Sequence, residues 1–277
     1  MKRIFIAAAA VLISSTVFLS SCKKDNNNGP DYPIPSNLKL LASGYAIGSA
    51  ARVEVYGTDS FFVGYNPLYL ALYDSVGNQR LTDAQITLHP MMTMMGGMSH
   101  SCPLENPASN NATDGLFSCA VVYIMPSGST GGWTLNVDIL NNKNGLQGTV
   151  AMAITVLNPA VAKMKSLTAL DDSSKLFVSV VKPVHPLVGV NDFEVTIHKK
   201  TGMMSFPAAN DYTPVVNPQM LSMGHGSPLN ENPVLQSNGH YKGKLNFTMS
   251  GEWRIYLDLN HNGAVADSSL YFDMNLE

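Results

Sequence analysis

Methionine and histidine side chains gather in one short stretch of the chain. The stretch runs from His89 to Cys102 and holds five of the fifteen Met of the sequence. These Met lie beside Gly, Ser and Pro, so we expect the backbone to turn there and the side chains to reach solvent or a pocket. Thioether sulfur and imidazole nitrogen are soft ligands that suit Cu(I). The pattern therefore predicts a copper site.

A second Met/His stretch lies in the later part of the chain, from Asn217 to Pro228. Neutral thioether and imidazole ligands favour Cu(I) over Zn²⁺, which prefers Cys, His or carboxylate. Met223 and His225 are the candidate ligands of this stretch, and Met125 and Met249, which occupy equivalent places in the two halves, would each add a thioether. Met203 and Met204 are instead predicted to be ordinary hairpin and core residues.

The Met-rich turns also have a second interpretation. Met is an adaptable side chain that serves well at contact surfaces. Under this interpretation the protein is a structural or adhesion module, and the turns form an interface with a protein or glycan and bind no metal. The sequence leaves both interpretations open.

The segments that must position these turns occur twice. Four segments of the first half align with segments of the second half, namely 63–72 with 188–197, 101–107 with 226–233, 115–125 with 239–249, and 133–138 with 253–258. The chain has only two Trp, Trp133 and Trp253, and they occupy equivalent places. We interpret this as a duplication with its joint near Asn158-Pro159.

The fold class is predicted to be all-β. Short segments with alternating apolar and polar residues are separated by Asn, Gly, Asp and Pro clusters, and Asn262-Gly263 predicts a tight hairpin turn. Each half then forms an immunoglobulin-like antiparallel β-sandwich, with one domain over residues 37–158 and the other over 159–277. The single Trp of each half is predicted to lie in its core.

The N-terminal residues are predicted to be a targeting signal for export. A basic start and a short apolar run precede Leu19-Ser20-Ser21-Cys22, which resembles a bacterial lipobox. Residues 1–21 would be a lipoprotein signal peptide, Cys22 the lipidated residue and residues 22–36 a flexible tether. We therefore expect a protein of the bacterial cell envelope, lipid-anchored in the periplasm or at the outer membrane.

Composition excludes other classes of function. The 277 residues are 45% hydrophobic and 13% charged, with a net charge of −3. The chain has no surplus of basic residues, which argues against nucleic-acid binding. The sequence has no G-x-S-x-G, H-E-x-x-H or phosphate-loop motif, so we expect no enzyme. The expected partners are the membrane, through the anchor, and an envelope protein that receives copper.

The second half resembles the YtkA-like domain family, which is related to FixH-type proteins. The resemblance is carried by Pro218 to Pro228, then Gly239 to Gly243, then Phe247 to Trp253, and a weaker copy occupies the first half. It implies an immunoglobulin-like sandwich and a role in periplasmic copper handling or oxidase assembly. Residue by residue, it implies Met220, Met223, His225 and Met249 as metal ligands, with Met92, Met95, His100 and Met125 as their equivalents in the first half.

Cys102 and Cys119 remain once Cys22 is lipidated. An even pair in an exported protein predicts a disulfide. The alternative is that Cys102 serves as a copper ligand beside His100.

Overall fold

The structure is a computed structural model, and it describes residues 32–276. The predicted signal peptide, the lipidated Cys22 and all but the last residues of the predicted tether lie outside the described residues. Within the described part, no helix has the length and apolar character needed to cross a membrane.

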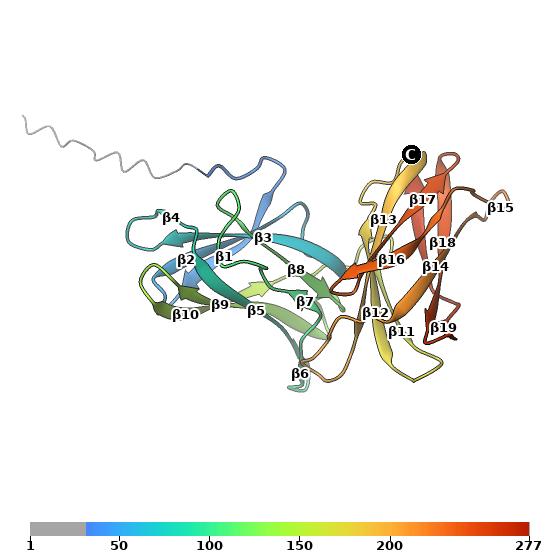
Figure 1. Ribbon diagram of the computed structural model, residues 1–277. Helices are drawn as coiled ribbons and strands as arrows, with labels where there is room; N and C mark the ends of the chain where they lie inside the picture. The colour runs from blue at the N-terminus through green and yellow to red at the C-terminus, as the bar shows by residue number, and fades with distance from the viewer. Residues whose placement is uncertain (1–31, 277) are drawn as a thin grey trace, which may run out of the picture. The chain divides into compact units, whose positions relative to one another are not determined.

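All regular structure in residues 32–276 is β-strand, in two successive groups (Figure 1). The first group comprises β1 (Lys39–Ala46), β2 (Ala51–Gly57), β3 (Gly64–Asp74), β4 (Arg80–Leu81), β5 (Ala84–Met94), β6 (Ser99–His100), β7 (Leu104–Glu105), β8 (Phe117–Tyr123), β9 (Gly131–Asn141) and β10 (Leu146–Ile154). The second comprises β11 (Met164–Thr168), β12 (Lys175–Lys182), β13 (Gly189–Lys199), β14 (Tyr212–Met220), β15 (His225–Gly226), β16 (Glu231–Ser237), β17 (His240–Phe247), β18 (Gly251–His261), β19 (Ala264–Asp267) and β20 (Tyr271–Leu276).

Each group forms two antiparallel sheets, as the prediction of an all-β immunoglobulin-like sandwich requires. In the first sandwich the sheets run β1-β2-β3-β8-β7, with β4 beside β3, and β10-β9-β5-β6. In the second they run β11-β12-β13-β17-β16 and β15-β14-β18-β19, with β20 beside β18. The alternation of apolar residues explains the layers, because one face of each sheet turns inward. The fold class is therefore confirmed.

The strand orders of the two sandwiches correspond, and so do individual contacts. Asn66 Nδ2 donates to the carbonyls of Phe62 and Gly64 at 2.8 and 2.7 Å. Asn191 Nδ2 donates to Leu187 and Gly189 at 2.7 and 2.9 Å. Each Asn thus holds the turn that leads into a central strand, β3 or β13.

The two Trp are core residues, as predicted. Trp133 and Trp253 are almost completely buried, and each lies in the core of its own sandwich. The predicted hairpin at Asn262-Gly263 is also confirmed, since His261 pairs with Ala264 and both turn residues have positive φ.

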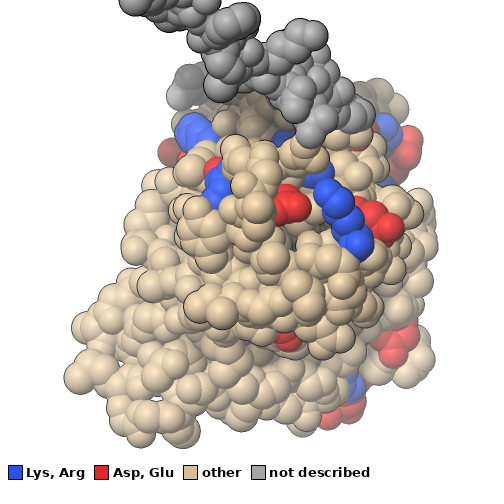
Figure 2. Space-filling model, turned by 90° about the vertical axis from the view of Figure 1, so that its left-hand side faces the viewer, with Lys and Arg blue, Asp and Glu red and all other residues tan. Residues whose placement is uncertain are grey.

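The surface carries few charges. On the face shown in Figure 2, acidic and basic side chains lie beside one another in small groups within a mostly uncharged surface. This agrees with the low charged fraction of the sequence.

Candidate metal centre

The second Met/His stretch forms a corner of the second sandwich. Strand β14 ends at Met220, and the backbone then turns back, with Gly224 N donating to Met220 O at 2.9 Å. Gly224 has φ +69°, a conformation that glycine adopts without strain. The turn brings His225 opposite Met220 in the short ladder of β14 and β15.

Trp253 forms the floor of this corner. The ring of His225 meets it edge-on, with 5.8 Å between centroids. The Trp253 Nε1 donates to the carbonyl of Met249 at 3.1 Å, which fixes the backbone of the segment before β18. The structure therefore places Met220, Met223, His225 and Met249 at one corner. We name it the second corner.

The residues of the second corner differ in exposure. Met223 is 61% exposed and Met249 37%, and His225 is partly exposed, whereas Met220 is buried in the core. Met223 and Met249 can therefore offer sulfur to solvent. Met220 lies beneath them, with its methyl group 3.2 Å from the position that a Cβ on Gly251 would take.

The tautomer of His225 follows from its hydrogen bond. Its Nδ1 lies 2.9 Å from the carbonyl oxygen of Gly226, and a carbonyl can only accept. Nδ1 therefore carries the proton, and in the neutral ring Nε2 keeps its lone pair. This is the arrangement in which a backbone carbonyl orients a histidine ligand for a metal.

The first sandwich repeats the corner with the same contacts. Met92 lies opposite both His100 and Trp133 in the strand ladders. The His100 ring meets Trp133 edge-on at 5.5 Å, and Trp133 Nε1 donates to Met125 O at 2.9 Å. His100 Nδ1 lies 2.8 Å from Ser101 O, so it too donates and leaves Nε2 as the acceptor. We name this the first corner.

The first corner is closed to solvent, whereas the second corner is open to it. His100 is only 5% exposed, and its Nε2 is a buried polar atom without a hydrogen-bond partner among the described residues. Met125 is partly buried against the core, while Met95 is 81% exposed at the tip of the turn after β5.

The expectation that the first Met stretch lies wholly in a turn is wrong for its first part. Met91, Met92 and Met94 lie in β5, and Met92 is completely buried, so it is a core side chain. Met220 is likewise a core residue at the end of β14. Alternation along the strand explains this, since Leu88, Pro90 and Met92 share the inward face.

The predicted disulfide is not formed in this structure. Cys102 and Cys119 are both free and buried in the core of the first sandwich. Burial raises the pKa of both thiols above their ordinary value. Both thiols therefore stay protonated, which disfavours Cys102 as a thiolate ligand beside His100.

Met203 and Met204 are hairpin residues, as predicted, but not core residues. They lie in a hairpin between β13 and β14, in which His198 pairs with Ala208 and Thr201 N donates to Ser205 O, and they are 43% and 55% exposed. Sequence reasoning also missed the contacts that this segment makes with the first sandwich.

A site at either corner must draw on thioether sulfur. Within residues 32–276, no three side chains of His, Cys, Asp or Glu lie close enough together to hold a metal ion. Sulfur from Met with one imidazole nitrogen suits a soft ion such as Cu(I) and suits Zn²⁺ or Ca²⁺ poorly.

Comparison with known proteins bears on the second sandwich. Residues 170–258 match the family model described as YtkA-like. This YtkA-like segment runs from β12 into β18 and includes the turn from Met220 to His225 and the Trp253 floor. The match fits a binding or interaction module. A search of curated protein sequences returned no match.

Solved structures similar to this chain include an adhesin and an integrin-binding protein. The Escherichia coli adhesin FdeC is 14% identical, with a TM-score of 0.27 over 84% of this chain and 66% of that chain. Invasin, a bacterial integrin-binding protein, is 10% identical, with a TM-score of 0.24 over 82% of this chain and 39% of that one. A protein described as pT26-6p is 10% identical, with a TM-score of 0.27 over 85% and 64%. The chain thus spans less than two thirds of the length of each.

Proposed function

We propose that the protein is an exported, lipid-anchored binding protein of the bacterial cell envelope that holds Cu(I) at the second corner. Its role is to buffer copper or to deliver it to an envelope protein, and it catalyses no reaction. The YtkA-like match over this sandwich supports a binding module.

The observation that carries the proposal is the state of His225. Its Nδ1 is tied to the Gly226 carbonyl, so the Nε2 lone pair is available on a partly exposed ring. Met223 and Met249 place thioethers at the same corner. Nε2 of His225 and the sulfurs of Met223 and Met249 would hold the copper ion. The sulfur of Met220 would be the ligand on the core side of the site.

The first corner is the second candidate site, with Met92, Met95, His100 and Met125. Its His100 presents the same tautomer and an unpartnered Nε2, so its chemistry fits a soft ion equally well. Burial of His100 means that an ion cannot reach it without movement of the covering residues.

Competition for Cu(I) tests the proposal. The full chain is mixed under reducing, oxygen-free conditions with Cu(I) and a coloured chelator, and retained copper is read from the loss of colour. We expect the wild-type protein to retain copper and the double variant Met223→Ala/His225→Ala to lose it. Met204→Ala is the matched control, because it removes a thioether that is 55% exposed and belongs to neither ligand set. Failure of the wild-type protein to compete at micromolar copper would falsify the proposal.

An interaction module without metal is the rival function. It is favoured by the apolar side chains that flank the same turn, since Leu221 is 55% and Leu229 75% exposed. A contiguous patch of exposed apolar side chains is a common feature of protein contact surfaces. Under this rival, the Met223→Ala/His225→Ala variant and the wild-type protein would show the same copper competition.

A further inference from the structure

We propose that the second sandwich is a lid over the first corner, held shut by the ion pair between Glu105 and His240. The proposal concerns access to His100 and rests on the proposed function only for the identity of the ligand. It explains why two corners with the same contacts differ in exposure.

The covering residues belong to the segment between β13 and β14. The carbonyl of Met203 accepts a hydrogen bond from Ser101 N at 2.9 Å, directly beside His100. Phe206, three residues later, is buried within the core cluster of the first sandwich. It stacks edge-on with Phe177 at 5.6 Å, and Phe177 belongs to the same cluster. The second sandwich therefore completes the core at the first corner.

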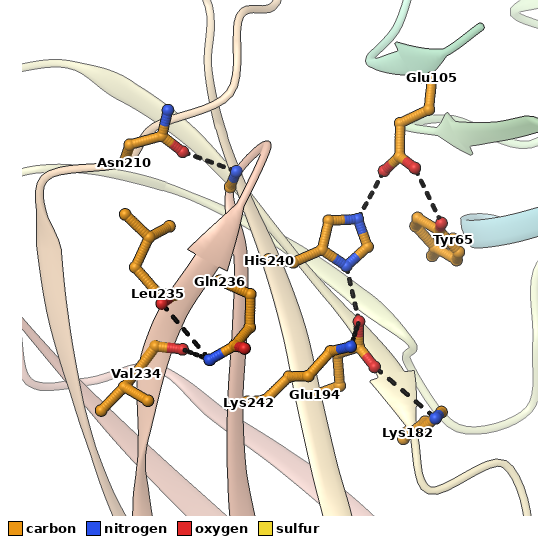
Figure 3. Close-up of polar contacts among 11 residues, drawn as sticks. Tyr65, Glu105, Lys182, Glu194, Asn210, Val234, Leu235, Gln236, His240 and Lys242 are labelled. Atoms are coloured by element: carbon orange, nitrogen blue, oxygen red, sulfur yellow. Dashed lines mark hydrogen bonds and ion pairs between the residues drawn. The ribbon is translucent and has the colours of Figure 1, made fainter. Parts of the chain in front are cut away.

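A charged contact between His240 and Glu105 joins the second sandwich to the first (Figure 3). His240 Nε2 lies 2.7 Å from Oε1 of Glu105, which is in β7 of the first sandwich. His240 Nδ1 lies 2.7 Å from Oε1 of Glu194 in β13 of the second. Carboxylates accept only, so both ring nitrogens donate and the ring is an imidazolium. Tyr65 OH donates to the other oxygen of Glu105 at 3.2 Å and fixes its orientation.

The connection between the sandwiches allows the movement. The chain is tied to the first sandwich up to Leu157, whose N and O bond to Phe61 O and Val63 N. It is tied to the second sandwich from Lys163, whose carbonyl accepts from Val180 N. The residues between these two points are mostly exposed, so opening at this short segment leaves the strand ladders of both sandwiches intact.

What lies under the lid is ready for a ligand. The Nε2 of His100 is buried, unpartnered and, given the bond from Nδ1 to Ser101 O, unprotonated in the neutral ring. A buried acceptor without a donor is unfavourable, and it gains a partner when a soft ion or water reaches it. Opening of the lid therefore converts the first corner from a closed into an accessible site.

The chain carries its own reporter of lid opening. Cys102 is a buried free thiol next to Ser101, so exposure of the first corner exposes it to a thiol reagent. Cys119 is also buried and free, but it lies in β8 between the neighbouring strands β3 and β7. Cys102 therefore reports on the corner, and Cys119 reports on unfolding of the sandwich.

The test is native-state labelling of the full chain with N-ethylmaleimide at pH 7, with each Cys quantified by peptide mass spectrometry. We expect His240→Gln and Glu105→Gln to raise the labelling rate of Cys102 by about ten-fold or more, because a charge-assisted bond is lost, and to leave Cys119 slow. His261→Gln is the matched control. His261 also lies between two carboxylates, Asp171 at 2.5 Å and Asp211 at 3.1 Å, but all three residues belong to the second sandwich.

Two results would overturn the lid. One is a Cys102 rate in both variants equal to that of the wild type. The other is a parallel rise at Cys102 and Cys119, which reports unfolding. No metal is used, so a chain that binds no Cu(I) but labels as expected refutes the proposed function and keeps the lid.

Discussion

The 2.7 Å contact between Nε2 of His240 and Oε1 of Glu105 joins residues 135 positions apart and links two separate sandwiches. Both partners are largely withdrawn from solvent, with the His240 side chain 14% and the Glu105 side chain 26% exposed. A charge-assisted bond in such a place is stronger than one on an open surface. Its loss is therefore expected to have measurable effects.

The first prediction concerns pH. Burial by itself lowers the pKa of His240, but hydrogen bonds and charges from Glu105 and Glu194 raise it to about 9. The folded pKa exceeds the unfolded value, so the stabilisation is fully present below about pH 6.5 and is lost as pH rises through about 9. Tyr65 and His198 lie near the His240 ring, and Lys182 and Lys242 pair with its partner Glu194.

Urea denaturation at pH 6 and pH 10 measures this. We expect the wild-type protein to lose about 1–2 kcal/mol more than His240→Gln between these two values, after allowance for solvent screening. On the acid side, burial raises the pKa of Glu194, but His240 and the neighbouring Lys residues hold it below its ordinary value. Its contribution is therefore present above about pH 4.5 and is lost progressively as pH falls below that value through the lowered pKa of the folded state. Equal slopes for both proteins in the alkaline range would contradict the prediction.

The second prediction concerns the thiols. The Cys22→Ser chain, denatured without reductant, should show two free thiols in a colorimetric titration, because Cys102 and Cys119 are not bonded. The same titration of the folded chain should be slow, because burial raises both pKa values and hides both sulfurs. A count of zero free thiols in denaturant would show that Cys102 and Cys119 form the disulfide after all.

The third prediction compares the two turn-holding Asn residues. Asn66 is buried and makes three bonds with the Phe62–Gly64 turn, whereas Asn191 makes the same bonds in a more exposed place. Asn66→Ala should therefore cost about 2–4 kcal/mol of unfolding free energy and Asn191→Ala about 1 kcal/mol. Urea denaturation of each variant measures the difference, and a larger cost for Asn191→Ala would refute it.

The sequence was sufficient to predict the strands, their grouping into sandwiches and the buried Trp pair, because alternation and turn residues are local signals. It misplaced Met92 because Pro90 was interpreted as part of a turn. In the structure Pro90 pairs with Leu135 of β9, and β6 begins to pair on the opposite side only at Met92 and Thr93. At Pro90, therefore, no strand of the described residues pairs with β5 on the side opposite β9. The missing N–H of proline is tolerated at such an unpaired edge.

The lid could not be predicted from the sequence for a different reason. The Glu105–His240 contact and the bond from Ser101 to Met203 depend on how one sandwich packs on the other. No spacing along the chain encodes that packing. The repeat did predict the pair of corners, and only their unequal exposure needed the structure.

The last prediction separates backbone strain from packing at the second corner. Gly251 has φ +120°, and a Cβ there would lie 3.2 Å from the methyl carbon of Met220. Gly263 has φ +80°, and a Cβ there would meet nothing within 4 Å. Both Gly→Ala changes impose an unfavourable backbone, at a cost of about 1–3 kcal/mol. Only Gly251→Ala also displaces Met220, so its unfolding free energy should fall further and its Cu(I) retention should weaken. Urea denaturation and chelator competition on both variants measure this, and equal losses in the two variants would show that Met220 moves aside without consequence.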